Sequence, residues 1–585
     1  MRQLTAQQRK TSSYQIRQLV GLFWLGLAAI LCGKFLLRPA FAQQPSIPPN
    51  APTPEEITPE TTPPDLPAEF PTEESPPLSV PPVPDSSPFE SAPTGAQFRI
   101  GEIELLGISV DPDELVVVVD GEAVSVSDRI TALTDQVASL DDLLALRSFI
   151  TQAYINAGYI TSGAFIPEQD FLGGGTVFIQ VVEGELELVE INGLSRLQGS
   201  YVRSRIQAQI KRPLQQANIE AALQRLQLNP LIDRVSAQLL AGSGPGQSIL
   251  LLTLEEAPPL SAGVSVNNYR AVGVGSEQIT PYLSYTNLLG IGDRINITDS
   301  LSEGLHSYSV AYTIPVNPYD GSLSFSFSNS DSRIIESEFE DLNIRGDSRT
   351  YSLLFEQPLI KSPNEELSLG LGFDLRRSET TVFNSRPFSD SQVSVLRFSQ
   401  NWVKRTPSRV LAARSQLSLG LNAFNATITD SGPDGEFFSW QGQFQWVEQL
   451  PKNKLLISRL SSQLTADQLL SLEQFSLGGI RTVRGYRDSQ FVRDNGIVVS
   501  TELRLPLTNP PERLQLTPFL EGGIGWNSSE RDSLEGLASV GIGLLWQADD
   551  NTRLRLDYGY PLIDQNDDRD TLQENGFTFS LDWSL

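Results

Sequence analysis

The chain has few of the residues on which enzyme active sites and metal centres most often depend. Among its 585 residues there is one cysteine, Cys32, and one histidine, His306. A single histidine cannot build a histidine-based zinc cluster. None of the glycine-rich clusters opens a helix after a parallel strand, so a nucleotide site is not indicated either. We therefore expect no enzymatic activity, no metal and no cofactor.

Basic residues are also in the minority. The chain has 43 lysines and arginines against 70 aspartates and glutamates, which gives a formal charge of −27. This excess of negative charge would repel phosphates, so we expect no nucleic-acid partner. The acidic run from Asp564 to Asp570 could hold calcium, but it lacks the glycine and final glutamate of a helix-loop-helix site. A surface hairpin is the favoured interpretation of that run.

The N-terminus has the pattern of a secretory signal peptide, predicted over residues 1–42. A basic start without acids precedes an apolar run from Leu19 to Leu31, and Ala40-Phe41-Ala42 offers a small-x-small cleavage site. A lipoprotein signal is disfavoured, because the bulky Leu31 stands directly before Cys32. Cleavage after Ala42 would remove Cys32, and the mature protein would then have neither a disulfide nor a reactive thiol.

Proline, serine, threonine and glutamate dominate residues 43–95. Prolines remove backbone donors, and the segment has little apolar surface to bury. This composition predicts a disordered, partly polyproline linker. A docking segment for a periplasmic partner or the cell wall is the alternative.

Two similar modules follow, predicted over residues 98–184 and 185–257. Each has the order strand, helices, strands, which indicates an internal repeat of a small α+β domain. In the first module, Leu140–Asn156 has helical spacing of apolar residues, and Ser139 stands at the position of a helix cap. In the second we expect helices at 201–210 and 219–228 and strands at 235–240 and 249–255.

The most specific motif of the first module is Tyr154-Ile-Asn-Ala-Gly-Tyr-Ile-Thr-Ser-Gly-Ala-Phe-Ile-Pro-Glu-Gln-Asp170. Gly158 is suited to end a helix in left-handed geometry, and Tyr159 is expected to begin the next strand. The motif resembles the Tyr-x-x-x-Gly-Tyr-x-Thr-Ser and Pro-x-Gln-Asp pattern of polypeptide-transport-associated (POTRA) domains. Some of these residues, above all Gly158 and Tyr159, could equally be needed only for folding. The resemblance singles out Tyr154, Gly158, Tyr159, Thr161, Ser162, Pro167 and Gln169.

From residue 260 to 585 the chain alternates between apolar and polar residues in short segments, of which we count sixteen. None is as long as the roughly 18 apolar residues of a membrane-spanning helix. An exported chain of this kind can cross a membrane only as a closed barrel. A soluble β-sandwich would also alternate, but sixteen strands after an export signal favour the barrel. The predicted fold is a membrane β-barrel of about 16 antiparallel strands, preceded by two small α+β POTRA domains.

The last strand shows the alternation most clearly and ends the chain. Its apolar residues also resemble the signal that is read by the barrel-insertion machinery, which is therefore an expected partner together with outer-membrane lipid. The residues on this face are Phe577, Phe579, Leu581, Trp583 and Leu585.

A polar segment, Leu472–Asn495, interrupts the strands and is too long for a tight turn. Its arginines would be costly in a pore wall unless the segment, within loop 472–496, folds into the wet lumen and meets an acid. Period two places Glu521 on the lumenal face, and Glu521 is the candidate acid. The segment resembles the Val-Arg-Gly-Tyr loop of two-partner secretion transporters, in which the loop arginine pairs with a barrel-wall acid. The matching residues are Arg481, Val483, Arg484, Gly485 and Tyr486.

The resemblance covers nearly all of the chain and implies a translocator of the haemolysin activation/secretion type. Such a protein sits in the outer membrane with its POTRA domains in the periplasm. It recognises an unfolded, large partner protein (an adhesin or haemolysin) and secretes it through the barrel pore. The alternative is an assembly or insertion factor for outer-membrane proteins, and a surface adhesin or passive porin is a third possibility. Two POTRA domains, rather than three or more, favour secretion.

Overall fold

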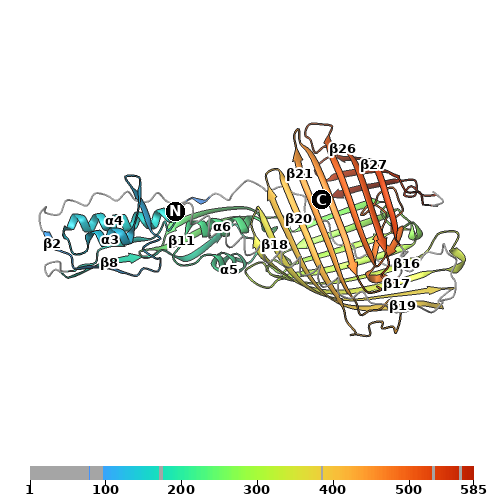
Figure 1. Ribbon diagram of the computed structural model, residues 1–585, viewed down its shortest axis with the longest axis horizontal. Coiled ribbons are helices and arrows are strands. Elements are labelled where there is room, and N and C mark those ends of the chain that lie inside the picture. Colours follow the sequence, from blue (N-terminus) through green and yellow to red (C-terminus); the bar gives the residue numbers. More distant parts are fainter. Residues whose placement is uncertain (1–77, 80–96, 170–174, 384–385, 530–533, 566–569) are drawn as a thin grey trace.

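The computed structural model describes residues 78–79, 97–169, 175–383, 386–529, 534–565 and 570–585. An elongated arm of helices and small sheets leads into a wide barrel (Figure 1). The predicted signal peptide and its cleavage site lie outside the described residues, as does the predicted linker apart from Leu78 and Ser79. No helix among the described residues is long and apolar enough to cross a membrane.

The outer part of the arm, residues 97–182, packs one long helix against a three-stranded sheet of order β3-β8-β7. The predicted helix is α4, Leu140–Asn156, and the Ser139 hydroxyl accepts the backbone N–H of Asp142 in a capping box. Helix α3 and the β4–β5 hairpin were not predicted, because both are short and α3 buries only Val126. The other elements are β2 (Gln97–Arg99), β3 (Glu102–Leu106), β4 (Val116–Val119), β5 (Glu122–Ser125), α3 (Val126–Leu133), β6 (Val137–Ser139), β7 (Gly163–Phe165) and β8 (Thr176–Val182).

The inner part of the arm has its own apolar cluster, formed by two helices against a sheet of order β1-β10-β11-β9. All the expected helices and strands are present. The linker residues Leu78 and Ser79, expected to lack regular structure, form a short strand, β1, that pairs in parallel with Ala237 and Gln238 of β10. The elements are β1 (Leu78–Ser79), β9 (Glu185–Asn192), α5 (Gly199–Gln209), α6 (Gln216–Gln227), β10 (Ile232–Ala241) and β11 (Gln247–Glu256).

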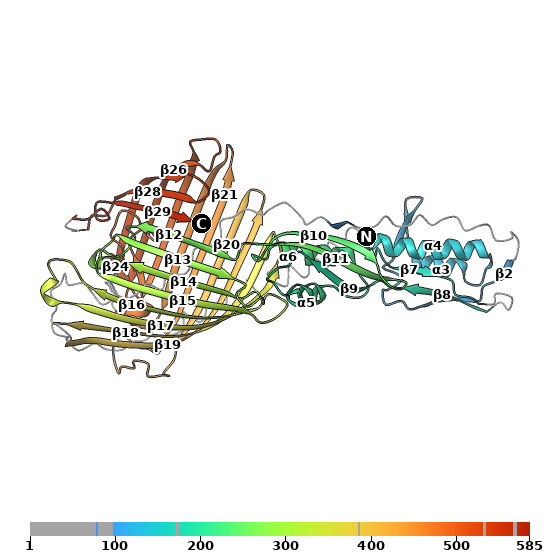
Figure 2. The same cartoon turned by 180° about the vertical axis from the view of Figure 1, so that it is seen from behind.

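The rest of the chain forms a closed barrel, in which each strand pairs antiparallel with the next and β29 returns to β12 (Figure 2). The predicted barrel of sixteen strands is confirmed. The strands are β12 (Leu260–Asn267), β13 (Gln278–Thr286), β14 (Arg294–Leu301), β15 (Leu305–Pro315), β16 (Ser322–Arg333), β17 (Arg345–Lys361), β18 (Glu365–Val382), β19 (Arg386–Thr406), β20 (Arg409–Gly420), β21 (Phe438–Leu450), β22 (Lys454–Thr465), β25 (Asn495–Pro506), β26 (Leu514–Trp526), β27 (Glu535–Gln547), β28 (Thr552–Pro561) and β29 (Phe577–Ser584).

The inner part of the arm is held to the barrel by charge. Asp320, in the turn between β15 and β16, accepts contacts from Arg205 of α5 at 2.9 Å, Arg225 of α6 at 3.5 Å and Lys361 of β17 at 3.0 Å. Beside them, the Arg205 guanidinium lies 3.5 Å from the centre of the Tyr201 ring. The arm therefore meets the barrel at the end from which β12 starts.

Candidate functional site

The lumenal loop, residues 472–495, connects β22 to β25 and folds back into the barrel. A short hairpin of β23 (Phe475–Leu477) and β24 (Phe491–Arg493) forms its stem. The stem packs against β25 and β26, and at the tip Val483, Arg484 and Tyr486 are each at most 2% exposed. A surface loop would leave this cationic tip in solvent, whereas here it is enclosed.

Arg484 at the loop tip is surrounded by three acids from the barrel wall. Its Nε and Nη2 donate to Glu521 Oε1 at 2.9 and 2.6 Å, and its backbone N–H donates to Glu521 Oε2 at 2.7 Å. Its Nη1 donates to Glu502 Oε2 at 3.0 Å and to Asp557 Oδ1 at 2.9 Å. We call Arg484, Glu502, Glu521 and Asp557, with the wall arginines Arg504 and Arg555, the tip cluster.

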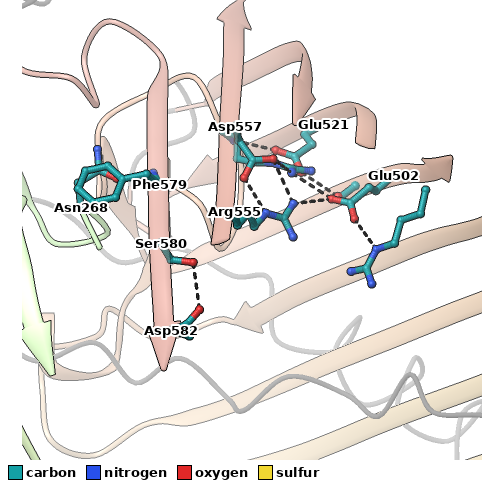
Figure 3. A network of polar contacts seen from close by, with 11 residues as sticks. Asn268, Glu502, Glu521, Arg555, Asp557, Phe579, Ser580 and Asp582 are labelled. Carbon is teal, nitrogen blue, oxygen red and sulfur yellow. Dashed lines mark hydrogen bonds and ion pairs between the residues drawn. The ribbon is translucent and has the colours of Figure 1, made fainter. Parts of the chain in front are cut away.

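The wall arginines complete the charge balance of the tip cluster. Arg555 of β28 bridges Asp557 at 2.6 Å and Glu502 at 2.7 Å, and Arg504 donates to Glu502 at 3.0 Å. Figure 3 shows Glu502 of β25, Glu521 of β26, and Arg555 and Asp557 of β28 converging from the barrel wall. Three arginines thus face three carboxylates. The attraction between the opposite charges offsets the cost of removing them from bulk water.

The other residues of the loop motif fit the tip against the wall. Val483 belongs to an apolar cluster with Leu477, Val498 and Leu537. Tyr486 Oη lies 2.7 Å from the carbonyl oxygen of Ala538 and 2.9 Å from that of Ile563.

Gly485 lies directly against the wall glycine Gly559. It has a φ of +93°, and an added Cβ would meet the Gly559 carbonyl carbon at 2.9 Å. Only glycine combines this left-handed backbone with so close an approach. Arg481, by contrast, is exposed at the tip.

Sequence reasoning found Glu521 but missed Glu502 and Asp557. Glu521 lies in an alternating segment, where Thr517 and Phe519 are also buried on the inner face and Leu520 is exposed on the outer one. The Phe519 ring lies 3.4 Å below the Arg484 guanidinium carbon. The pattern Ser500, Glu502, Arg504 on β25 has the same period and could have revealed the second acid.

The POTRA motif residues mostly hold their own domain together. The Tyr154 hydroxyl donates to Glu183 Oε1 at 3.0 Å, and Glu183 also accepts the backbone N–H of Ser109 at 2.6 Å. Gly158 has a φ of +89° directly after α4, as expected. Tyr159 does not begin a strand, contrary to our expectation. It lies in the turn after α4, its ring packs edge-on against Tyr154, and β7 starts only at Gly163.

The second half of the motif ties the segments on both sides of β7 to their neighbours. The Gln169 side chain bonds to Phe178 as the backbone of a neighbouring strand would. It accepts the Phe178 N–H at 2.8 Å and donates to the Phe178 carbonyl at 2.7 Å. The Ser162 hydroxyl accepts the N–H of Gly184 at 2.8 Å. Pro167 offers its carbonyl oxygen to Gln169 at 3.3 Å, and Thr161 packs against Gly184.

The terminal strand presents its apolar residues outward, while Thr578 and Ser580 are buried on the inner side. Near its start, the Asn268 side chain accepts the N–H of Phe579 at 2.8 Å and donates to the Phe577 carbonyl at 3.0 Å, across the seam that closes the barrel (Figure 3). The residues predicted to share one face are Phe577, Phe579, Leu581, Trp583 and Leu585, of which Phe579 is only partly exposed.

A closed barrel with a charged loop in its lumen, preceded by small domains on one side, defines a class: outer-membrane transporters with periplasmic POTRA domains. The model of the POTRA domain of ShlB type matches residues 117–184. The model described as haemolysin secretion/activation protein ShlB/FhaC/HecB matches residues 246–545. The chain belongs to this family, and it is a translocator of the two-partner secretion type in the outer membrane.

Curated relatives agree with this assignment. The outer membrane transporter CdiB of Dickeya dadantii (strain 3937) is 26% identical over 421 residues, which cover 69% of this chain and 74% of the relative. CdiB of Escherichia coli O6:K15:H31 is 25% identical over 500 residues, with 81% and 79% covered. The heme/hemopexin transporter protein HuxB of Haemophilus influenzae (strain KW20 / Rd) is 22% identical over 436 residues, with 69% and 75% covered.

Solved structures share the fold. The structure of CdiB from Escherichia coli superimposes with a TM-score of 0.63 at 22% identity, covering 86% of this chain and 93% of that one. BamA from Haemophilus ducreyi lacking POTRA domains 1–3 superimposes with a TM-score of 0.53 at 14% identity, covering 83% and 100%. At these identities both likenesses show the fold and not the function.

Proposed function

We propose that the POTRA domains capture an extended segment of a large, unfolded partner protein in the periplasm and pass it into the barrel lumen. The observation that carries the proposal is the joint between arm and barrel. Asp320 forms ion pairs with basic side chains of α5, α6 and β17 and so holds the inner POTRA domain at the periplasmic end of the pore. A segment captured on the arm is thereby delivered to the pore entrance.

Free sheet edges offer the means of capture, because a strand with unpaired backbone groups can accept an additional strand. The orders of the two larger arm sheets leave β3, β7, β9 and the two-residue β1 at edges. On β7 the N–H of Ala164 already donates to Thr151, at 3.1 Å. The edge strand β9, in the inner part of the arm, is longer, with eight residues, and its Leu188 is 47% exposed. We assign β9 as the preferred edge for a partner strand, with Leu188 as an apolar contact.

The loop tip then obstructs the lumen and must move before the partner can be exported. With Arg484 seated among its three acids, the loop occupies the lumen. The partner would pass as an extended chain beside or past the loop, and folding outside the cell would supply the drive. The site residues of the Val-Arg-Gly-Tyr motif thus position the loop rather than perform chemistry.

Deleting residues 98–256 tests the proposal in cells that produce a large secreted partner. The truncated barrel should still insert and remain heat-modifiable on gels, while the partner stays in the periplasm. Within the intact chain, Leu188→Ser on β9 should lower export. The matched control is Leu228→Ser, which removes an exposed apolar side chain from the arm outside β9 and should leave export unchanged. Normal release of the partner by the truncated barrel would refute the proposal.

The same cells test the rival function of an assembly factor. A factor that inserts outer-membrane proteins should change the level of other barrel proteins when it is deleted. The secretion function predicts that these levels stay constant and that only the partner is retained.

A further inference from the structure

The lumenal loop has a second charged attachment, at its root. The short 3-10 helix η3 (Ser471–Glu473) precedes the stem, and the side chain of Glu473 is 3% exposed. Glu473 Oε1 accepts Arg376 Nη1 at 2.8 Å and Arg397 Nη2 at 2.8 Å. Arg376 lies on β18 and Arg397 on β19.

Further contacts close this group, which we call the root cluster: Glu473, Arg376, Arg397 and Asp374. Arg376 Nη1 also donates to the carbonyl of Leu472. Arg376 therefore binds both the backbone and a side chain of the root. Arg397 pairs with Asp374 as well and donates to the Ser418 hydroxyl at 2.8 Å. Two arginines thus meet two carboxylates, and without these acids each buried arginine would carry a large desolvation cost.

The two clusters lie on different walls of the barrel. Counted from β12, β18 and β19 are the seventh and eighth strands, whereas β25, β26 and β28 are the twelfth, thirteenth and fifteenth of sixteen. The root is therefore fixed on one side of the lumen and the tip on another. The polarity is also opposite, since the loop brings an acid to arginines at its root and an arginine to acids at its tip.

We propose that Glu473 is a positioning residue that anchors the loop to the β18–β19 wall independently of Arg484. Release of the tip then leaves the loop attached at its root, and the loop turns about this point instead of leaving the lumen. The opposite polarity also fixes the orientation, because a reversed loop would place like charges together. The anchoring by Glu473 does not depend on the proposed function, and only the role of the loop movement in export rests on it.

Thiol labelling of the full-length protein in outer membranes tests the independence of the two anchors. In a Cys32→Ser background, a single cysteine at Ser471 reports on the root and one at the fully buried Val483 on the tip. A charged, membrane-impermeant maleimide is added from outside. Glu473→Gln should raise labelling at position 471 about tenfold and leave position 483 slow, and Arg484→Gln should do the reverse; tenfold corresponds to about 1.4 kcal/mol.

The matched control is Asp390→Asn. Asp390 pairs with Arg377 on the same two strands, but both side chains are about half exposed, at 52% and 51%. Loss of this exposed pair should change neither labelling rate. If folded Glu473→Gln labels at the wild-type rate at position 471, or if both reporters accelerate together in each variant, the root is not a separate anchor.

A double variant separates a shared ion pair from independent effects. Glu473→Gln and Arg397→Gln should each accelerate root labelling, and the double variant should accelerate it by less than the product of the two single effects, because both substitutions remove the same ion pair. Single effects that simply multiply in the double variant would overturn the proposal. If Glu473→Gln does not assemble into a heat-modifiable barrel, Arg397→Lys replaces it. Lysine cannot reach Glu473, Asp374 and Ser418 together, so an unchanged rate at position 471 would contradict the anchor.

These labelling rates need no partner protein. A failure of the anchor would therefore appear in labelling while export continues, and a failure of the proposed function would appear as normal labelling without any export.

Discussion

Arg484 and Glu521 are joined by three hydrogen bonds, two from the guanidinium to Oε1 at 2.9 and 2.6 Å and one from the backbone N–H to Oε2 at 2.7 Å. The backbone bond fixes the position of the loop itself, not only that of its side chain. Because Glu502 and Asp557 hold the other side of the guanidinium, Arg484 does more than pair with a single acid.

Arg484→Ala is expected to be more harmful than Glu521→Ala. Removing the arginine leaves buried carboxylates without their shared cation, for which we expect a stability loss of about 3 kcal/mol, whereas removing Glu521 leaves two acids for Arg484 and costs about 1–2 kcal/mol. Export should fall in both variants. The measurements are the temperature at which the heat-modifiable barrel unfolds and the amount of secreted partner.

The double variant of these two residues should be no worse than Arg484→Ala alone, because both substitutions remove the same interaction. Cysteines placed at 484 and 521 should form a crosslink. Effects that simply add, together with no crosslink, would contradict the pairing.

Gly559→Ala should displace the loop tip although Gly559 belongs to the barrel wall. A Cβ at this position would meet the backbone nitrogen of Gly485 at 2.6 Å, so the tip must move away from β28. We expect a loss of about 1–3 kcal/mol and reduced export. Gly522→Ala on β26 is the control, since its nearest neighbour would be 3.6 Å away. Equal behaviour of the two variants would show that close contact with Gly485 is unimportant.

The outer POTRA domain should lose stability in acid through Glu183. Burial would raise the pKa of Glu183, but hydrogen bonds from Ser109 and Tyr154 outweigh it and the pKa is lowered. A lowered pKa stabilises the fold above the ordinary value of about 4.3, and this stabilisation is lost as the pH falls through the folded-state pKa.

Urea unfolding of a fragment of residues 97–256 should therefore show Glu183→Gln less stable than wild type at pH 7 and closer to it in acid. Tyr154→Phe, which removes one hydrogen bond to Glu183, should cost about 1 kcal/mol at pH 7. A difference between Glu183→Gln and wild type that does not change with pH would argue against this role of the carboxylate.

Asp320→Ala should loosen the joint between the arm and the barrel. The substitution leaves Arg205, Arg225 and Lys361 facing one another without their shared acid. Spin labels on α6 and on a periplasmic turn should show a broader distance distribution, while the barrel keeps its heat-modifiable behaviour. Asp233→Ala, an exposed acid at the start of β10, is the control and should leave the distribution narrow.

Local patterns in the sequence were enough to predict the sixteen strands and the main helices. The alternation of apolar and polar residues depends only on neighbours two positions apart, and the capped helix Leu140–Asn156 depends only on the next turn. The arginine-bearing segment could be recognised for the same reason, because a long polar insertion between strands is visible without knowing its surroundings.

Which residues the loop meets was decided by the tertiary structure alone. Arg484 meets acids 18, 37 and 73 residues further along the chain, and Glu473 meets arginines 97 and 76 residues before it. These pairings require the barrel to close and every strand to settle in register, which brings distant strands to the same depth in the lumen. Periodicity assigns a side chain to a face of its strand, but only barrel closure and strand register determine which charged group it meets in the lumen.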